Sequence, residues 1–265
     1  MNAKKTAKAI YIIWLRGVKQ SLRQEVGFIS NLAFPLLMLF FMGTGLKGSV
    51  NMENMGLIGS SDSTIDYMDF LLPGIIGMNL LFSSTFGGIS ILEDKKFGFL
   101  KEILVAPVSR VSIVIGITLA STTISALQGI VIIAAAPLID IDLNFFHIPI
   151  VLLFIFIVGM AFTSFGVAIA TQIEDIRALQ SIESFLMFPL LFMSGAFFPI
   201  TELPGGIQTL AYINPLFYGV DGMRCALLGA GTSTLPMWID LLVVTAFCAI
   251  LILLGAYLFN KSEGI

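Results

Sequence analysis

The feature that most constrains this chain is a series of apolar stretches without charged side chains, each long enough to cross a bilayer. About 20 apolar residues in a helix span the hydrocarbon core, because every backbone amide then bonds within its own segment. Hydrophobic residues make up 57% of the 265 residues and charged residues only 12%, which is too few to cover a water-soluble surface. The sequence therefore predicts an all-α membrane protein with six transmembrane helices, at residues 26–46, 70–92, 111–137, 148–173, 184–201 and 241–260.

Residues 3–24 precede the first predicted span and follow a different pattern. Apolar residues recur there every three or four positions and include Tyr11 and Trp14, while lysines and arginines occupy the remaining positions. This pattern predicts a basic amphipathic helix along the membrane surface, with both aromatic rings at the depth of the lipid headgroups. A helix on a soluble cytosolic domain is the alternative, but the chain offers no such domain.

Lysines and arginines orient the chain, because cytoplasmic segments carry an excess of them. With a cytoplasmic N-terminus, 12 of the 14 basic residues fall on cytoplasmic segments, and only Lys47 and Arg224 fall outside. The sequence therefore predicts a multi-pass protein of the cell membrane with both termini in the cytoplasm.

Residues 93–110 form the most polar break between two spans, and the same orientation places them in the cytoplasm. They carry seven charged side chains of both signs. Gly98 permits a turn, and Pro107 ends any helix that reaches it. Between these two residues, the apolar positions have helical spacing, which predicts a short amphipathic helix. A plain connecting loop is the commoner case, but the mixed charge and the defined ends favour docking to a partner.

Residues 203–235 are largely apolar but are interrupted by prolines and glycines. They are too broken for a full span and predict two short helices, split at Asn214 and Pro215, that dip into the outer leaflet. A small folded outer cap is the alternative. Asp221 and Arg224 lie three residues apart and can pair on one helix face, which favours a stabilising role over substrate contact.

The predicted spans contain no acid or base, whereas ion-coupled carriers place ionisable groups at mid-membrane. This absence favours a transporter whose energy comes from outside the bilayer. Polar and large soft side chains in the spans are candidates for lining a path, although packing between helices is their commoner role. The candidates are Asn79, Ser83, Thr122, Gln128, Phe188 and Phe192.

The sequence shows no motif for chemistry of its own. It has no glycine-rich phosphate loop of the G-x-x-x-x-G-K-[ST] type, only one histidine, and two cysteines. We therefore expect no catalytic residues, no cofactor site and no metal site. The net charge of -3 gives no reason to expect a nucleic-acid partner.

Taken together, these segments resemble the permease subunits of type-2 ATP-binding-cassette exporters. Residues 93–110 are similar to the family's coupling helix, with Phe99 and Lys101 as departures, and residues 194–224 are similar to its fifth span and re-entrant hairpin. The resemblance implies a homodimer of this chain with two copies of a cytosolic ATPase, which would bind ATP and Mg. The residues implied to couple the ATPase are Glu93, Gly98, Leu100, Lys101, Glu102, Ile103, Leu104, Pro107 and Arg110.

The function that these expectations favour is export of an amphipathic substrate, such as a drug, a lipid or a glycan carrier, out across the membrane. Two other classes of protein stay open. One is a passive channel or secondary carrier, which would conduct substrate as this chain alone. The other is a membrane scaffold for a soluble partner, which would bind that partner without transport.

Overall fold

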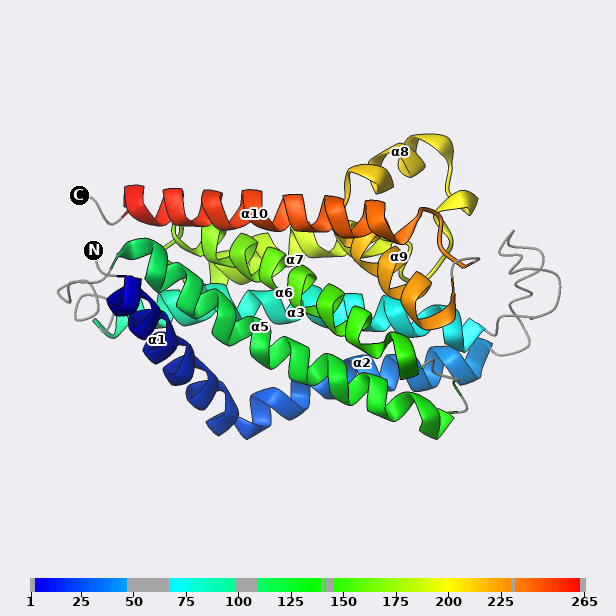
Figure 1. The fold of residues 1–265 in the computed structure, drawn as a ribbon, viewed down its shortest axis with the longest axis horizontal. Helices are drawn as coiled ribbons and strands as arrows, with labels where there is room; N and C mark the ends of the chain where they lie inside the picture. The colour runs from blue at the N-terminus through cyan, green and yellow to red at the C-terminus, as the bar shows by residue number, and fades with distance from the viewer. Residues whose placement is uncertain are drawn as a thin grey trace.

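The computed structural model describes residues 3–46, 67–98, 109–139, 141, 145–229 and 232–262, and every regular element in these ranges is a helix. The long helices form an elongated bundle (Figure 1). We call the end that holds both chain termini the terminal end, and the opposite end, with α8 and α9, the hairpin end. The α-helices are α1 (Ala3–Arg23), α2 (Glu25–Leu46), α3 (Tyr67–Lys96), α5 (Arg110–Ala135), α6 (Ile148–Ala170), α7 (Ile176–Phe192), α8 (Gly205–Ile213), α9 (Pro215–Leu228) and α10 (Met237–Ser262), with short 3-10 helices at Ala136–Ile139, Phe145–His147 and Ile200–Glu202.

Helix α3 is the centre of the bundle and packs against α2, α5, α6, α7 and α9. Apolar side chains cover it on all sides, and Phe70, Leu71 and Ile75 are among those with almost no exposed surface. A helix that is apolar all round is expected at the middle of such a fold, because it has no face to turn toward water. The main hydrophobic core lies around α3 and extends to α6 and α9.

Within the described ranges, five helices are long and apolar enough to cross a membrane, at Gly27–Gly45, Tyr67–Lys96, Arg110–Ile139, Ile148–Ala170 and Met237–Phe259. They coincide with five of the six predicted spans, so the all-helical, multi-pass architecture is confirmed.

The remaining predicted span, 184–201, was wrong in its boundaries. The helix in this region is α7, which begins at Ile176 and ends at Phe192. Asp175 fixes its start, because the Asp175 side chain accepts a hydrogen bond from the backbone amide of Arg177. Turns occupy residues 193–198. The prediction failed because it followed the charge-free run, whereas the helix starts earlier and contains Arg177 and Glu183.

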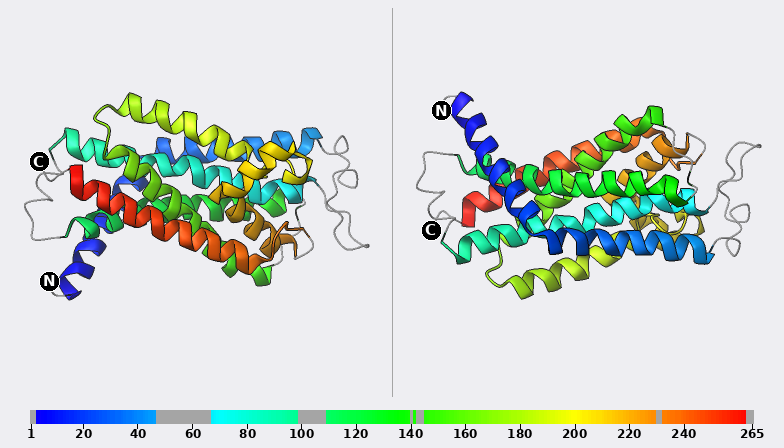
Figure 2. Two further views of the ribbon diagram at one scale, coloured as in Figure 1. Left: turned by 90° about the horizontal axis from the view of Figure 1, so that it is seen from above. Right: turned by 90° about the horizontal axis from the view of Figure 1, so that it is seen from below.

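The predicted amphipathic helix is present as α1, which lies obliquely across the bundle near the terminal end and meets α2 at an angle (Figures 1 and 2). It packs mainly against α5. The predicted split of the outer segment is also present, because Asn214 separates α8 from α9. The depth of α1 and of the hairpin in a bilayer stays a prediction.

Candidate functional site

The predicted coupling segment is attached at the terminal end, where α3 finishes and α5 begins (Figure 1). Gly98 has a φ of 79°, in the left-handed region that glycine adopts at little cost, so the turn expected there is confirmed. Ser109 caps α5 with its side chain, and Arg110 is the first residue of that helix. Glu93 lies in the last turn of α3. The other residues of the predicted contact lie outside the described part of the chain, and these are Leu100, Lys101, Glu102, Ile103, Leu104 and Pro107.

Two side chains of α1 hold that helix against the two helices that flank the coupling segment. The Arg16 Nη2 atom forms a salt bridge of 2.5 Å with Asp94 Oδ1 on α3. The Trp14 indole N–H donates a hydrogen bond of 3.0 Å to Thr123 Oγ1 on α5. Asp94 lies in the last turn of α3 and Thr123 lies midway along α5, so a displacement of either helix would act on α1.

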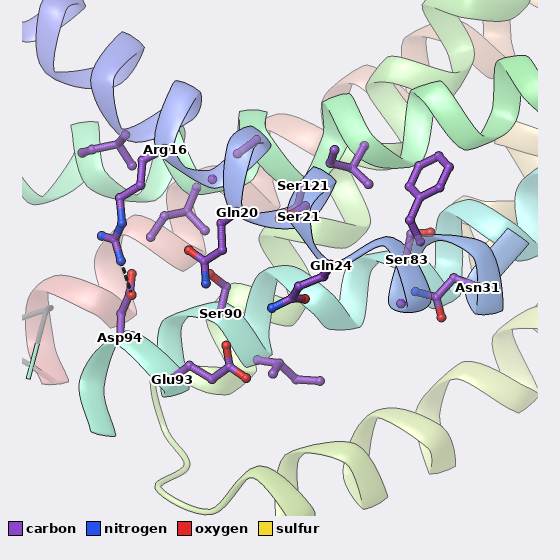
Figure 3. Close-up of a pocket in the computed structure, with 18 of the residues that line it drawn as sticks. Arg16, Gln20, Ser21, Gln24, Asn31, Ser83, Ser90, Glu93, Asp94 and Ser121 are labelled. Atoms are coloured by element: carbon purple, nitrogen blue, oxygen red, sulfur yellow. Dashed lines mark hydrogen bonds and ion pairs between the residues drawn. The ribbon is translucent and has the colours of Figure 1, made fainter. Parts of the chain in front are cut away.

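A buried polar network joins three of the residues predicted to line a path. Gln128 Oε1 accepts a hydrogen bond of 2.8 Å from the Ser83 hydroxyl and one of 3.4 Å from the Asn79 amide. Ser83 and Gln128 also line a pocket of about 180 Å³ between α1, α2, α3 and α5 (Figure 3). The structure therefore brings these three residues of α3 and α5 together beside a cavity.

The other three predicted path residues lie elsewhere. Thr122 is fully buried, and its hydroxyl has no hydrogen-bond partner among the described residues. Phe188 packs its ring edge to face against Phe82, and Phe192 packs against Phe197. Both phenylalanines are half exposed on α7. The six residues thus do not form one continuous lining within a single chain.

The hairpin is held by Asn214 at the junction of α8 and α9. The Asn214 side chain accepts a hydrogen bond of 3.0 Å from the amide of Leu216, which caps the start of α9, and Pro215 is the first residue of that helix. The same side chain donates a hydrogen bond to the backbone carbonyl of Leu190 on α7. One asparagine therefore ends α8, starts α9 and attaches both to the bundle.

Asp221 and Arg224 form a second anchor, and the predicted pairing between them is present at 3.9 Å. Both Asp221 carboxylate oxygens accept hydrogen bonds from the backbone amide of Thr234, and one also accepts from Leu235. Arg224 donates to the Gly195 carbonyl at 2.9 Å, and its guanidinium lies 3.8 Å from the centre of the Phe70 ring. These contacts join α9 to α3, to the turn after α7 and to the segment before α10.

Two buried acids were missed by the expectation that the spans lack ionisable groups. Glu183 lies on the buried face of α7 with Leu179 and Met187, and only 1% of it is exposed. Asp240 lies in the first turn of α10, is fully buried, and has no hydrogen-bond partner for either carboxylate oxygen among the described residues. The position of Glu183 inside a helix could have been predicted from Asp175, because a helix-capping aspartate there places the helix start before the charge-free run.

Comparison with known proteins places this geometry in a family. Residues 8–228 match the ABC-2 type transporter family. The chain belongs to this family. Among its relatives, the ycf38 protein of Cyanophora paradoxa, described as a transport permease, is 28% identical over 81% of this chain and 72% of its own. Nodulation protein J of Rhizobium leguminosarum bv. viciae is 25% identical over 88% of this chain and 85% of its own, and the inner membrane transport permease YadH of Escherichia coli is 24% identical over 89% of both.

The protein is therefore the permease subunit of an ABC-2 type transporter, and ATP hydrolysis is the task of a partner ATPase subunit. The family match runs from α1 to the end of α9, so it includes the α1 contacts, the pocket and both hairpin anchors.

Proposed function

We propose that the permease exports an amphipathic substrate as a homodimer, driven by two copies of a cytosolic ABC ATPase that dock on residues 93–110. The observation that carries this proposal is the position of that segment. It joins the two helices, α3 and α5, that α1 ties together through Asp94 and Thr123. A push on the segment would therefore act on three helices at once.

Helix α3 is suited to carry such a movement through the protein. It runs unbroken for 30 residues from the hairpin end to the terminal end and is the most buried of the candidate spans. A well-packed helix moves as a rigid element, because its side chains are interlocked with several neighbours. ATP-driven closure of the docked subunits would then tilt α3 and change the contacts at the hairpin end.

The exposed faces of α2 and α7 support the proposed dimer and the path along its axis. Phe185, Phe188 and Phe192 form a stripe along α7 and are 79%, 50% and 58% exposed. Only 17% of the apolar stretch of α2 is buried, and Phe34, Phe40 and Phe41 are at least half exposed on it. Both helices pack on α3 with one face, so the opposite faces are free to contact a second copy or lipid. An apolar substrate that passes between the two copies would also contact these faces.

The proposed location is the inner or plasma membrane, with both termini in the cytoplasm. The distribution of lysine and arginine supports this orientation. Both termini also lie at one end of the bundle, together with the start and finish of the coupling segment (Figure 1). The relative YadH is described as an inner membrane permease, which supports the choice of membrane.

The test is co-expression of the permease with candidate ATPase subunits, followed by purification and reconstitution. We expect a complex whose ATP-dependent transport is lost in Glu102→Lys and in Pro107→Gly, while insertion and dimer formation persist. Glu174→Lys, which changes an exposed acid between α6 and α7, is the matched control and should retain transport. A permease that purifies without any ATPase, or that conducts substrate alone, would refute the proposal in favour of a scaffold or a channel.

A further inference from the structure

The pocket between α1, α2, α3 and α5 has a composition that suggests a ligand. It lies where α1 meets α2, and polar side chains from all four helices line it (Figure 3). Its volume of about 180 Å³ leaves room for several water-sized groups. The polar residues that line it are Arg16, Gln20, Ser21, Gln24, Asn31, Ser83, Ser90, Glu93, Asp94, Ser121 and Gln128.

The charges on the described lining favour a cation. Arg16 is the one basic residue in it, and its guanidinium is paired with Asp94. Glu93 adds a second carboxylate to the wall, so acids outnumber bases by one. A partly desolvated wall with excess negative charge attracts a cationic group more strongly than the same charge would in water.

The remaining polar groups favour hydroxyls on the same ligand. Gln128 is 2% exposed, and its Oε1 atom is already occupied by Ser83 and Asn79. Its amide N–H groups donate no hydrogen bond to another described residue and lie beside the cavity, where they can donate to a ligand oxygen. Ser90 and Ser121 can both donate and accept.

The mixed polar and apolar lining of the pocket indicates an amphiphilic ligand. Apolar side chains, including Ile13, Phe28 and Ile117, form part of its wall beside the polar groups. A wider cavity of about 530 Å³, lined in part by Glu93, Asp94 and Phe97, continues from it toward the terminal end. A head group can therefore reach the polar wall from the terminal end while its chain lies against apolar side chains.

We propose that this pocket is a loading site that takes the protonated, hydroxylated amine head group of an amphiphile. The role in loading depends on the proposed export function, which it makes more specific by naming the substrate class. Binding itself requires neither ATP nor the partner ATPase. The site lies within one chain and is separate from the exposed phenylalanine stripe on α7.

The experiment measures equilibrium binding to the purified permease in lipid nanodiscs at pH 6.5, with two probes of equal size. The probes are dodecyl 2-amino-2-deoxyglucoside and dodecyl glucoside, which differ in an amine for a hydroxyl. We expect the amine probe to bind about tenfold more tightly, and Glu93→Gln to remove most of this preference. Glu174→Gln removes an exposed acid outside the pocket and should leave the preference unchanged.

Gln24 provides a second variant, because it is exposed at the pocket wall and its substitution places little demand on folding. Gln24→Glu should tighten binding of the amine probe, and Gln24→Lys should weaken it, each by roughly threefold to tenfold. Equal affinity for the two probes, or tighter binding of the anionic dodecyl glucuronide, would overturn the inference. Either of these results would refute the proposed substrate class but not the export function. Failure to recruit an ATPase would refute the export function but not the binding site.

Discussion

Replacement of Asp221 by asparagine is the sharpest test of how the hairpin is held. Asp221 is fully buried and accepts hydrogen bonds from the amides of Thr234 and Leu235. Asparagine has the same shape but keeps only one acceptor oxygen and loses the charge. The substitution therefore removes one charge-assisted hydrogen bond and leaves the buried Arg224 guanidinium without its counter-ion, although it still donates to the Gly195 carbonyl.

The magnitude follows from the geometry. A hydrogen bond to a buried charged group contributes about 1.5–3 kcal/mol. At an effective dielectric constant of about 20, opposite charges separated by the 3.9 Å between Arg224 and Asp221 attract by about 4 kcal/mol. Part of this attraction is offset by desolvation, and loss of one member of a buried pair costs about 3–5 kcal/mol in measured cases. We expect Asp221→Asn to lower the free energy of unfolding by about 4 kcal/mol.

The assay is reversible unfolding of the purified permease in mixed detergent and SDS, followed by loss of helical circular dichroism. Arg224→Met should cost a similar amount, because it leaves the Asp221 charge without its counter-ion and the Gly195 carbonyl without its donor. The double variant should be less destabilised than the sum of the two single variants, with a coupling of at least about 2 kcal/mol. Loss of less than about 1 kcal/mol in Asp221→Asn, or additive single effects, would refute this account of the anchor.

Three further predictions follow from other contacts. Gly74→Ala should lower the free energy of unfolding by about 2 kcal/mol or more, because the new Cβ would lie 2.0 Å from the Ala196 carbonyl oxygen. Gly206→Ala is the control and should not lower it, because the space around Gly206 is open. Unfolding in SDS measures both variants, and equal effects would contradict the prediction. Trp14→Phe should loosen α1 by about 1 kcal/mol through loss of its hydrogen bond to Thr123, seen as faster hydrogen exchange in α1; unchanged exchange would argue against it. Phe188→Cys, with the native cysteines replaced, should form a disulfide between copies under oxidation if α7 faces α7 in the proposed dimer, and a purely monomeric product would count against that face.

The spans were predictable because their signal is local and strong. A helix in a bilayer must satisfy its backbone internally, so composition alone locates most of the long helices. Helix α7 shows where this logic fails. Its first eight residues include Arg177 and Glu183, which end an apolar run but do not end a helix. The decisive local signal was the capping side chain of Asp175.

The hairpin was also predictable in outline, because its determinants are close in sequence. The Asn214–Pro215 break and the spacing of Asp221 and Arg224 were enough to predict the split and the pair. The further partners of Arg224 were not predictable, since Gly195 is 29 positions away and Phe70 is 154 positions away. These contacts depend on how α3 and the turn after α7 meet α9.

The pocket could not be derived from the sequence because four helices supply its walls. The salt bridge between Arg16 and Asp94 joins residues 78 positions apart, and the Ser83–Gln128 contact joins residues 45 positions apart. Ser83 and Gln128 were predicted to line a path because they are polar residues within spans. Glu93 was predicted to belong to the coupling surface, and the structure places it also in the pocket wall.

Helix α3 connects the α1 contact, the polar network and the hairpin anchor. Asp94 near one end holds α1, Asn79 and Ser83 in the middle contact Gln128, and Phe70 near the other end packs under Arg224. The helix is about 45 Å long at 1.5 Å per residue for its 30 residues. Because α3 is buried along its length, the tilt that we propose at its terminal end would disturb the pocket, the Phe70–Arg224 contact or both. Substrate release and hairpin movement should therefore be coupled, and Arg224→Lys, which keeps the charge but weakens the stacking on Phe70, should alter transport rate more than probe binding in the pocket.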